Sequence, residues 1–151
     1  MLRKLSSLFG LSQEKPFNKT YELKDTLGTG SIGTVRIGTL KGKRKCTDFN
    51  EYEDEDINRF VTNEIDILQE LSHPNICPLY EVHFETANVY LVMELMSGGD
   101  VFSRIAKQGR FAEKEAADVF VQMVSAVKYL HSKDIVHRGV MPENFMFTNK
   151  D

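Results

Sequence analysis

Apolar residues in this chain alternate with polar ones in some stretches and recur every three or four positions in others. Alternation is typical of half-buried strands, because successive strand side chains point to opposite faces. Val35 and Ile37, for example, share one face of such a stretch, and Arg36 points to the other. Strands are therefore expected over residues 21–23, 34–40, 79–84 and 89–95, with turns at 41–43 and 86–88.

The three-to-four-residue spacing predicts helices, in which such positions share one face. Helices are expected over residues 57–71, 101–107 and 113–132. The last of them has an apolar stripe made of Ala116, Val119, Phe120, Met123, Val127 and Leu130. Asp100 stands where a side chain can cap a short helix, and the acidic residues of 48–56 predict a solvated linker. The order of strands, helix, strands and helices indicates an α+β fold.

Composition narrows the class of protein. The chain has 151 residues, of which 41% are hydrophobic and 27% charged, as is typical of a globular domain. A formal charge of −3 gives no sign of nucleic-acid binding. Cys46 and Cys77 lack metal-type spacing and are expected to be reduced thiols, which favours a cytoplasmic protein.

Residues 1–20 are expected to form an N-terminal lead-in. Within it, the apolar residues of 1–11 fall at helical spacing beside Arg3 and Lys4. Two interpretations stay open: a short helix that touches a membrane, or a tail that docks its apolar stripe on the domain. No apolar run approaches the roughly 18 residues that a membrane-spanning helix needs.

A glycine-rich motif follows the first predicted strand. Its glycines, Gly28, Gly30 and Gly33, have the spacing G-x-G-x-x-G. Glycines at this spacing let backbone N–H groups approach phosphate oxygens. The motif alone is weak evidence, since dinucleotide-binding proteins share it. In those proteins a helix follows the glycines, whereas here a strand-like segment with Val35 follows, which disfavours that alternative.

Three further motifs carry candidate chemistry. Glu64 lies beside the apolar stripe of the helix expected at 57–71, where it is either solvated or turned inward. An apolar strand runs through residues 90–96 into a glycine turn. Near the end of the chain, His137-Arg138 is followed by Pro142-Glu143-Asn144, a spacing that is hard to obtain by chance.

With these four motifs in this order, the chain resembles the protein kinases over residues 21–150. It is most similar to the Ser/Thr kinases of the calcium/calmodulin-dependent and calcium-dependent group, through residues 71–76, 93–100 and 142–147. The resemblance implies a small lobe over 21–96, with a five-stranded antiparallel sheet and one helix. It implies the first part of a helical large lobe over 97–151. ATP, with Mg²⁺, is the ligand it implies.

The resemblance assigns a nucleotide-contacting set: Gly28, Gly30, Gly33, Val35, Met93, Glu94, Met96, Asp100 and Met146. The three glycines would cover the phosphates. Val35 would lie above the adenine and Met146 below it, with Met93 as the gatekeeper. Glu94 and Met96 would present the hinge backbone. Asp100 would lie near the ribose and a basic substrate residue.

The resemblance also implies a Lys–Glu pair and a metal site. Glu64 would pair with a strand lysine, and Asn144 would hold one Mg²⁺ ion. The usual Val-Ala-x-Lys tetrad is missing, and Lys45, 19 positions before Glu64, is the best candidate for the lysine. Lys43 or Arg44 could take its place, and all three are equally compatible with solvated hairpin charges.

Two positions depart from the kinase pattern. Gly139 stands where the resemblance expects the catalytic aspartate, and Met141 stands where it expects a lysine. The chain also reaches Asp151 before any Asp-Phe-Gly segment, which predicts an incomplete large lobe and half a metal site. The sequence therefore predicts a pseudokinase-like binding module with a residual ATP pocket.

Two alternatives remain from the sequence. One is an active ATP-dependent Ser/Thr kinase represented by a partial chain, and the other is a degenerate product without function. For the pseudokinase-like module, with its incomplete large lobe, the apolar face of the 113–132 helix is expected to be exposed. That face would then bind a protein partner or cause poor solubility.

Overall fold

The computed structural model divides the chain into two compact units, which are described separately. The first unit combines residues 1–71 with 78–95, and the second combines 72–77 with 96–151. The amphipathic stretch predicted at 1–11 lies outside the described residues. No helix in the described part has the length and apolar character needed to cross a bilayer. The structure describes residues 17–29, 33–40, 44–50, 55–85 and 88–149, with the backbone alone for 44–50 and 55–60.

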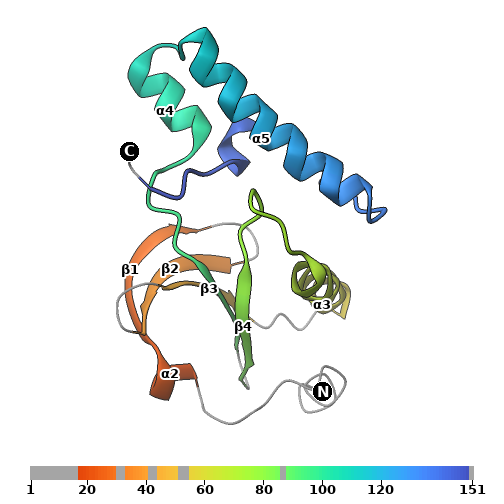
Figure 1. The fold of residues 1–151 in the computed structure, drawn as a ribbon. Coiled ribbons are helices and arrows are strands. Elements are labelled where there is room, and N and C mark those ends of the chain that lie inside the picture. Colours follow the sequence, from red (N-terminus) through yellow and green to blue (C-terminus); the bar gives the residue numbers. More distant parts are fainter. Residues whose placement is uncertain (1–16, 30–32, 41–43, 51–54, 86–87, 150–151) are drawn as a thin grey trace. The chain divides into compact units, whose positions relative to one another are not determined.

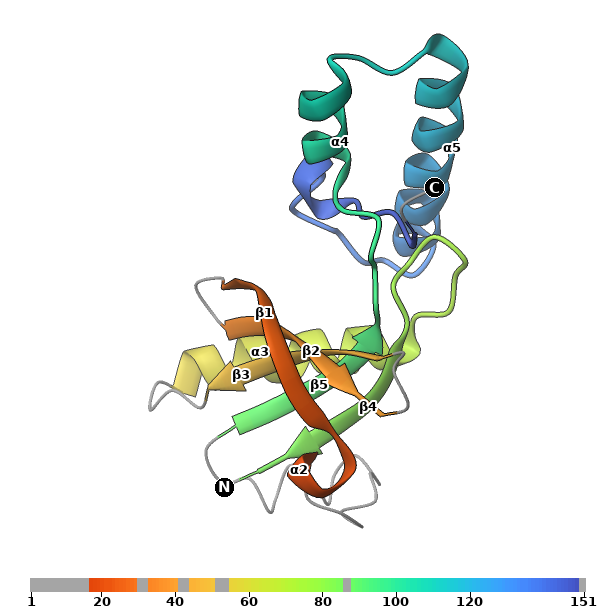
Figure 2. The same ribbon diagram turned by 90° about the vertical axis from the view of Figure 1, so that its left-hand side faces the viewer.

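The first unit is built on an antiparallel sheet in the order β1-β2-β3-β5-β4 (Figure 1, Figure 2). Its strands are β1 (Glu22–Thr29), β2 (Gly33–Thr39), β3 (Arg44–Asn50), β4 (Leu79–Phe84) and β5 (Asn88–Glu94). Short connections join β1 to β2 and β4 to β5, as is usual in hairpins. Together with the helices of both units, this sheet confirms the predicted α+β class.

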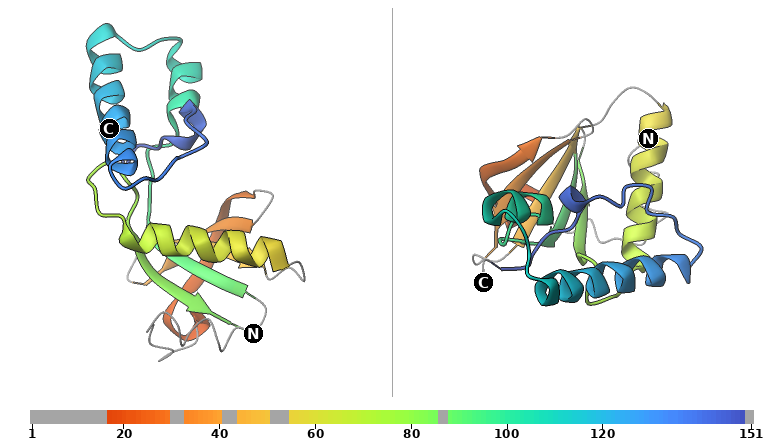
Figure 3. Two further views of the ribbon diagram at one scale, coloured as in Figure 1. Left: turned by 90° about the vertical axis from the view of Figure 1, so that its right-hand side faces the viewer. Right: turned by 90° about the horizontal axis from the view of Figure 1, so that it is seen from above.

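One face of the sheet is covered by α3 (Glu55–Glu70), which runs along it in Figure 3. Ile65 on the helix is 1% exposed and packs in one cluster with Val82, Val89 and Leu91. Val89 and Leu91 are two residues apart on β5, so they point to the same face. This cluster is the larger part of the core of the first unit.

The opposite face of the sheet has a second cluster. Tyr90 and Val92 alternate with the α3-facing residues of β5 and pack against Phe17 and Tyr21. Phe17 comes from α2 (Phe17–Thr20), a single helical turn. Strand β5 is therefore buried on both faces, which explains its continuous apolar sequence.

Two stretches predicted as connections contain regular structure. The lead-in predicted over 1–20 closes with α2, whose Phe17 is 2% exposed. The linker predicted over 48–56 was too long, because residues 48–50 belong to β3 and α3 begins at Glu55. Strand β3 is paired with β2 on one side and β5 on the other, and this pairing overrides the low strand propensity of its acidic residues.

The second unit contains α4 (Val101–Gln108), α5 (Glu113–His131) and the short 3₁₀ helix η1 (Pro142–Asn144). Asp100 caps α4 as predicted, because its Oδ1 accepts a hydrogen bond of 2.7 Å from the N–H of Ser103.

The predicted apolar stripe of helix α5 is buried only in part. Within the stripe, Leu130 is 6% exposed, whereas Phe120 is 64% exposed and Ala116 is exposed as well. The described neighbours of α5 pack against its C-terminal half, which leaves these two residues uncovered. The predicted partner surface on this helix stays a prediction.

The segment 72–77, expected only to end a helix, packs on α5 through a histidine. The ring of His73 stacks on Tyr129 with centroids 5.0 Å apart, and its Nε2 lies 3.2 Å from Ser125 Oγ. The backbone N–H of Asn75 donates to His73 Nδ1 at 3.1 Å. Because Nδ1 accepts a hydrogen bond, a neutral imidazole has its N–H at Nε2, and this N–H donates a hydrogen bond to Ser125 Oγ.

Candidate functional site

The β1–β2 hairpin holds the ends of the glycine motif in register. Gly28 pairs with Val35, and Thr29 pairs with Thr34 across the two strands. A Cβ atom added to Gly28 would meet nothing within 4 Å, so the space above this backbone is open. Gly33 opens β2, and the tip of the hairpin, which includes Gly30, lies outside the described residues. The structure thus brings Gly28 and Val35 together, as the phosphate-loop interpretation requires.

Arg36 was noticed in the sequence only for its direction, and the structure gives it a contact. Strand β1 loses regular register between Leu23 and Thr26, and again between Thr26 and Gly28. The guanidinium Nε and Nη2 of Arg36 donate to the carbonyl of Lys24 inside the first irregularity, at 3.3 and 3.0 Å. This contact supports the bent strand that leads to the glycines. An arginine on the face opposite an apolar pair was the available signal.

The candidate lysines fall in strand β3. Lys45 pairs with Ile37 of β2 and with Met93 of β5. Arg44 also lies in this strand, whereas Lys43 lies outside the described residues. Backbone pairing therefore places Lys45 directly beside the predicted gatekeeper. Which of the three cations replaces the usual lysine, or whether all are solvated hairpin charges, stays a prediction.

Glu64 is exposed, although its neighbour Ile65 is buried. The inward orientation considered for this side chain is therefore wrong. Its pairing with a strand lysine stays a prediction, because the structure describes β3 by its backbone alone.

The predicted hinge begins at the end of β5. Met93 packs against the Ile65 cluster, and the N–H of Glu94 donates to the carbonyl of Pro78 at 3.3 Å. Met96 begins the 96–151 stretch of the second unit, and its side chain is half-buried. The contacts of these residues with adenine stay predictions.

Asp100 has both carboxylate oxygens engaged within the second unit. Oδ1 accepts from the N–H of Ser103 and Oδ2 from its hydroxyl, each at 2.7 Å. The backbone hydrogen bond from Ser103, followed by the hydroxyl, lowers the pKa of Asp100 from its usual value. The carboxylate is therefore held as a charged helix cap, and its predicted contact with the ribose would use the remaining lone pairs.

Residues 97–101 pair with residues 145–148. Gly98 donates to the carbonyl of Phe147 at 3.0 Å, and Phe147 donates back to Gly99 at 2.8 Å. Asp100 and Met146 lie opposite each other in this bridge, so two predicted nucleotide contacts are adjacent.

A side-chain contact strengthens the same bridge. The guanidinium of Arg104 lies 3.8 Å from the centroid of the Phe147 ring, which is a cation–π contact. No pattern in the sequence predicted this pair. The contact ties α4 to the segment that follows η1.

The loop around Gly139 is held by its own hydrogen bonds. The N–H of Gly139 donates to His137 Nδ1 at 3.2 Å, and Asn144 Nδ2 donates to the carbonyl of Gly139 at 2.8 Å. Arg138 has a φ of 59°, which turns the chain sharply before the glycine. The structure thus brings Gly139 and Asn144 together.

A side chain at position 139 would have little room. A Cβ built on Gly139 would lie 3.0 Å from Asn144 Nδ2, which is tighter than ordinary van der Waals contact. It would also lie 3.6 Å from His137 Nδ1. The amide of Asn144 must shift slightly before any larger residue fits here.

Known proteins resemble this chain over nearly its whole length. The profile of the protein kinase domain matches residues 21–151. Calcium/calmodulin-dependent protein kinase type 1B from Rattus norvegicus is 36% identical over 140 residues, which cover 89% of this chain and 40% of that protein. Myosin light chain kinase A from Dictyostelium discoideum is 38% identical over 137 residues, which cover 88% of this chain and 46% of that protein.

A solved structure agrees with the fold. The crystal structure of Rad53 1–466 in complex with AMP-PNP matches with a TM-score of 0.79 and 30% identity, over 92% of this chain and 38% of that one. This chain therefore spans less than half the length of each of these three relatives.

Proposed function

Because this chain belongs to the protein kinase domain family, we propose that it is a Ser/Thr-kinase-like domain that binds ATP without transferring its phosphate. The observation that carries the proposal is Gly139, which occupies the position expected for the catalytic aspartate. The loop around it keeps its hydrogen bonds, so the change removes a chemical group and leaves the loop conformation in place.

The missing groups act on the transfer step. A carboxylate at position 139 would accept the proton of the substrate hydroxyl, and positioned proton transfer contributes about 10²–10⁴ in rate. Met141, exposed and uncharged, stands where a cation would stabilise the transferring phosphoryl group. Electrostatic stabilisation is the main source of catalysis in phosphoryl transfer, so the second loss adds to the first.

The residues that would bind the nucleotide are better preserved. The hairpin pairing of Gly28 with Val35 leaves open space above the glycine, which suits close approach of phosphate oxygens. Lys45 sits in register with Met93, which would put a cation and the gatekeeper on neighbouring strands. The Rad53 structure, described as a complex with AMP-PNP, supports an adenine nucleotide as the ligand class.

Asn144 fits the metal half of the proposal. Its Nδ2 donates a hydrogen bond to the carbonyl of Gly139. Its Oδ1, on an exposed side chain, can coordinate a metal ion. An amide oxygen is a suitable ligand for Mg²⁺, which supplies charge neutralisation to the phosphates when bound. In the described part of the chain, no three His, Cys, Asp or Glu side chains gather to hold a metal ion. Phosphate and water oxygens would therefore complete the shell.

The test separates binding from chemistry. Thermal unfolding of the 151-residue protein is followed with increasing ATP, with and without Mg²⁺, beside a labelled γ-phosphate transfer assay on a generic basic peptide. We expect a saturable rise in Tm, since a ligand that binds only the folded state stabilises it. We expect no transfer above a no-enzyme control. An unchanged Tm at millimolar ATP contradicts the binding claim, and measured transfer favours the active-kinase alternative.

Matched variants identify the cation. Lys43→Met, Arg44→Met and Lys45→Met remove one charge each from the same short stretch. Lys45→Met is expected to weaken ATP binding about tenfold or more, because a phosphate contact made by a cation is lost. The other two should leave the ATP response unchanged, and an equal response in all three variants would exclude Lys45 as the phosphate ligand.

A further inference from the structure

Phe17 is among the most buried side chains of the protein, although it precedes the region that matches the kinase profile. Its ring stacks on Tyr90 with centroids 4.0 Å apart and planes 5° from parallel. Tyr21 also stacks on it, with centroids 5.1 Å apart, and His83 meets it edge-on at 5.5 Å. Three rings from separate parts of the chain thus contact one phenyl group, on the face of the sheet opposite α3.

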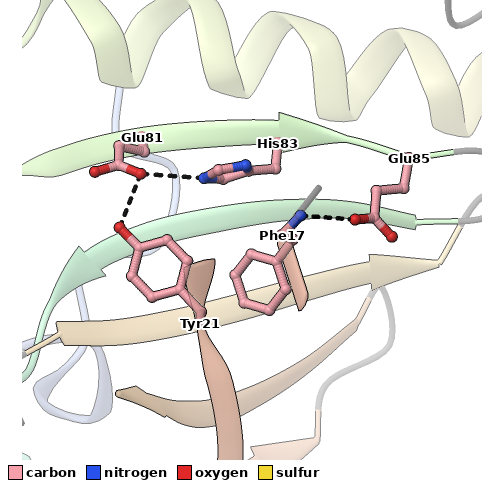
Figure 4. A network of polar contacts seen from close by, with 5 residues as sticks. All are labelled: Phe17, Tyr21, Glu81, His83 and Glu85. Atoms are coloured by element: carbon pink, nitrogen blue, oxygen red, sulfur yellow. Dashed lines mark hydrogen bonds and ion pairs between the residues drawn. The ribbon is translucent and has the colours of Figure 1, made fainter. Parts of the chain in front are cut away.

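Polar groups around this ring are paired, as Figure 4 shows. The backbone N–H of Phe17 donates to Glu85 Oε1 at 2.8 Å. The hydroxyl of Tyr21 donates to Glu81 Oε2 at 2.8 Å, and His83 Nε2 lies 3.1 Å from the same oxygen. The carboxylate of Glu81 therefore fixes the two rings that flank Phe17, and Glu85 holds the backbone that carries it.

The short helix cannot maintain this position by itself. Helix α2 has four residues, and a single helical turn is unstable in water without tertiary contacts. The docked state therefore depends on the ring of Phe17 and on the hydrogen bond to Glu85. A site that recognises an aromatic ring together with an adjacent backbone N–H has the requirements of a peptide-binding pocket.

We propose that the β4–β5 face formed by Tyr90, His83 and Glu85 is a docking site for an aromatic peptide residue, occupied in cis by Phe17. The occupant is helix α2 (Phe17–Thr20) of this chain. Covalent attachment keeps it at a high effective concentration, which suits a pocket of modest intrinsic affinity. The segment that precedes the kinase domain is thereby anchored on the sheet face opposite α3.

The first test empties the pocket and refills it from outside. Phe17→Ala in the 151-residue protein is expected to lower Tm by roughly 10 °C or more, as for other buried aromatic residues. A synthetic peptide with the sequence of residues 13–20 should raise the Tm of this variant saturably at roughly millimolar concentration. The same peptide with alanine in place of Phe17 should not, and neither peptide should shift the intact protein.

A matched control is Phe102→Ala, which removes a phenyl ring that is 53% exposed. It should change Tm by no more than a few degrees and give no response to the peptide. Equal losses of Tm in the two variants, or no rescue of Phe17→Ala by the peptide, would overturn the proposal.

A second variant keeps the test decisive if Phe17→Ala does not fold. Glu85→Gln leaves the aromatic pocket intact and weakens the acceptor for the Phe17 N–H. Release of α2 should speed tryptic cleavage after Lys19 severalfold, because cleavage follows local opening. Glu70→Gln, which changes an exposed carboxylate on α3, serves as the control. Equal cleavage rates in Glu85→Gln and Glu70→Gln would contradict the anchor.

Discussion

The two units of this protein bury their apolar residues to different extents. In the first, both faces of the sheet are covered, and Ile65, Leu91 and Val92 are at most 1% exposed. In the second, Phe120 and Val121 of α5 are about two-thirds exposed. The first unit therefore depends on a packed core, whereas the described part of the second depends on strand pairing, helix caps and local hydrogen bonds.

The difference bears on the proposed function, in which ATP binding is retained and phosphate transfer is lost. The glycine hairpin, β3 and the end of β5 belong to the well-packed unit, and they carry the proposed nucleotide contacts. Gly139 and Met141 belong to the other unit, on an exposed loop. Under the proposed function, Gly139 removes the catalytic carboxylate while backbone groups and Asn144 hold the loop.

The largest contrast is expected between apolar truncations in the two units. Ile65→Ala should lower the free energy of unfolding by about 2–5 kcal/mol, because it leaves a cavity between α3 and the sheet. Val121→Ala should change it by no more than about 0.5 kcal/mol, since that side chain is exposed. Urea denaturation of both variants measures the two values. Similar losses would show that the α5 face is covered in solution.

A glycine pair tests whether backbone pairing holds the second unit. A Cβ at Gly98 would overlap the carbonyl oxygen of Asn149 and the Cβ of Phe147, which cannot both move away. Gly98→Ala should therefore destabilise the protein by about 1–3 kcal/mol or more. Gly28→Ala is the control, because its added methyl group meets nothing. Thermal unfolding compares them, and a stable Gly98→Ala variant would refute the tight approach.

The smallest effect concerns the cap of α4 and depends on pH. The pKa of Asp100 is lowered by its bonds to Ser103, so its contribution is fully present above the unfolded-state value of about 3.9. The contribution is lost as the pH falls through the lower folded-state value. Asp100→Asn keeps an oxygen for the Ser103 N–H but does not titrate. Between about pH 5 and pH 2, Tm should fall more steeply for the wild type than for this variant.

Periodicity along the chain was sufficient for helices α3, α4 and α5 and for strands β2, β4 and β5, whereas β1 continues to Thr29, beyond the predicted 21–23. The helix predicted over 57–71 corresponds to α3 at Glu55–Glu70, and the predicted cap at Asp100 is confirmed. Both depend on local properties, which are the spacing of apolar residues and one side chain beside a helix terminus. The hydrogen bond between Asn144 and the carbonyl of Gly139 was not predicted, although the two residues lie five positions apart on one loop.

What escaped prediction depends on distant neighbours. Strand β3 contains Lys45 and Asp48, which do not favour strands, and it forms because β2 and β5 pair with it on either side. Phe17 looked like part of a loose lead-in, and only the position of Tyr90 on another strand explains its burial. The four-residue spacing between Phe17 and Tyr21 was the available local signal.

The burial of Phe17 also changes where this domain begins in physical terms. The match to the family profile starts at residue 21, but the packed interior already includes the ring at position 17. A polypeptide cut at Tyr21 would expose the rings of Tyr90 and His83 to water and lose the acceptor contact of Glu85. Such a fragment would aggregate more readily and be less stable than one that starts upstream of Phe17. For this protein, the limits of the family profile are narrower than the limits of folding.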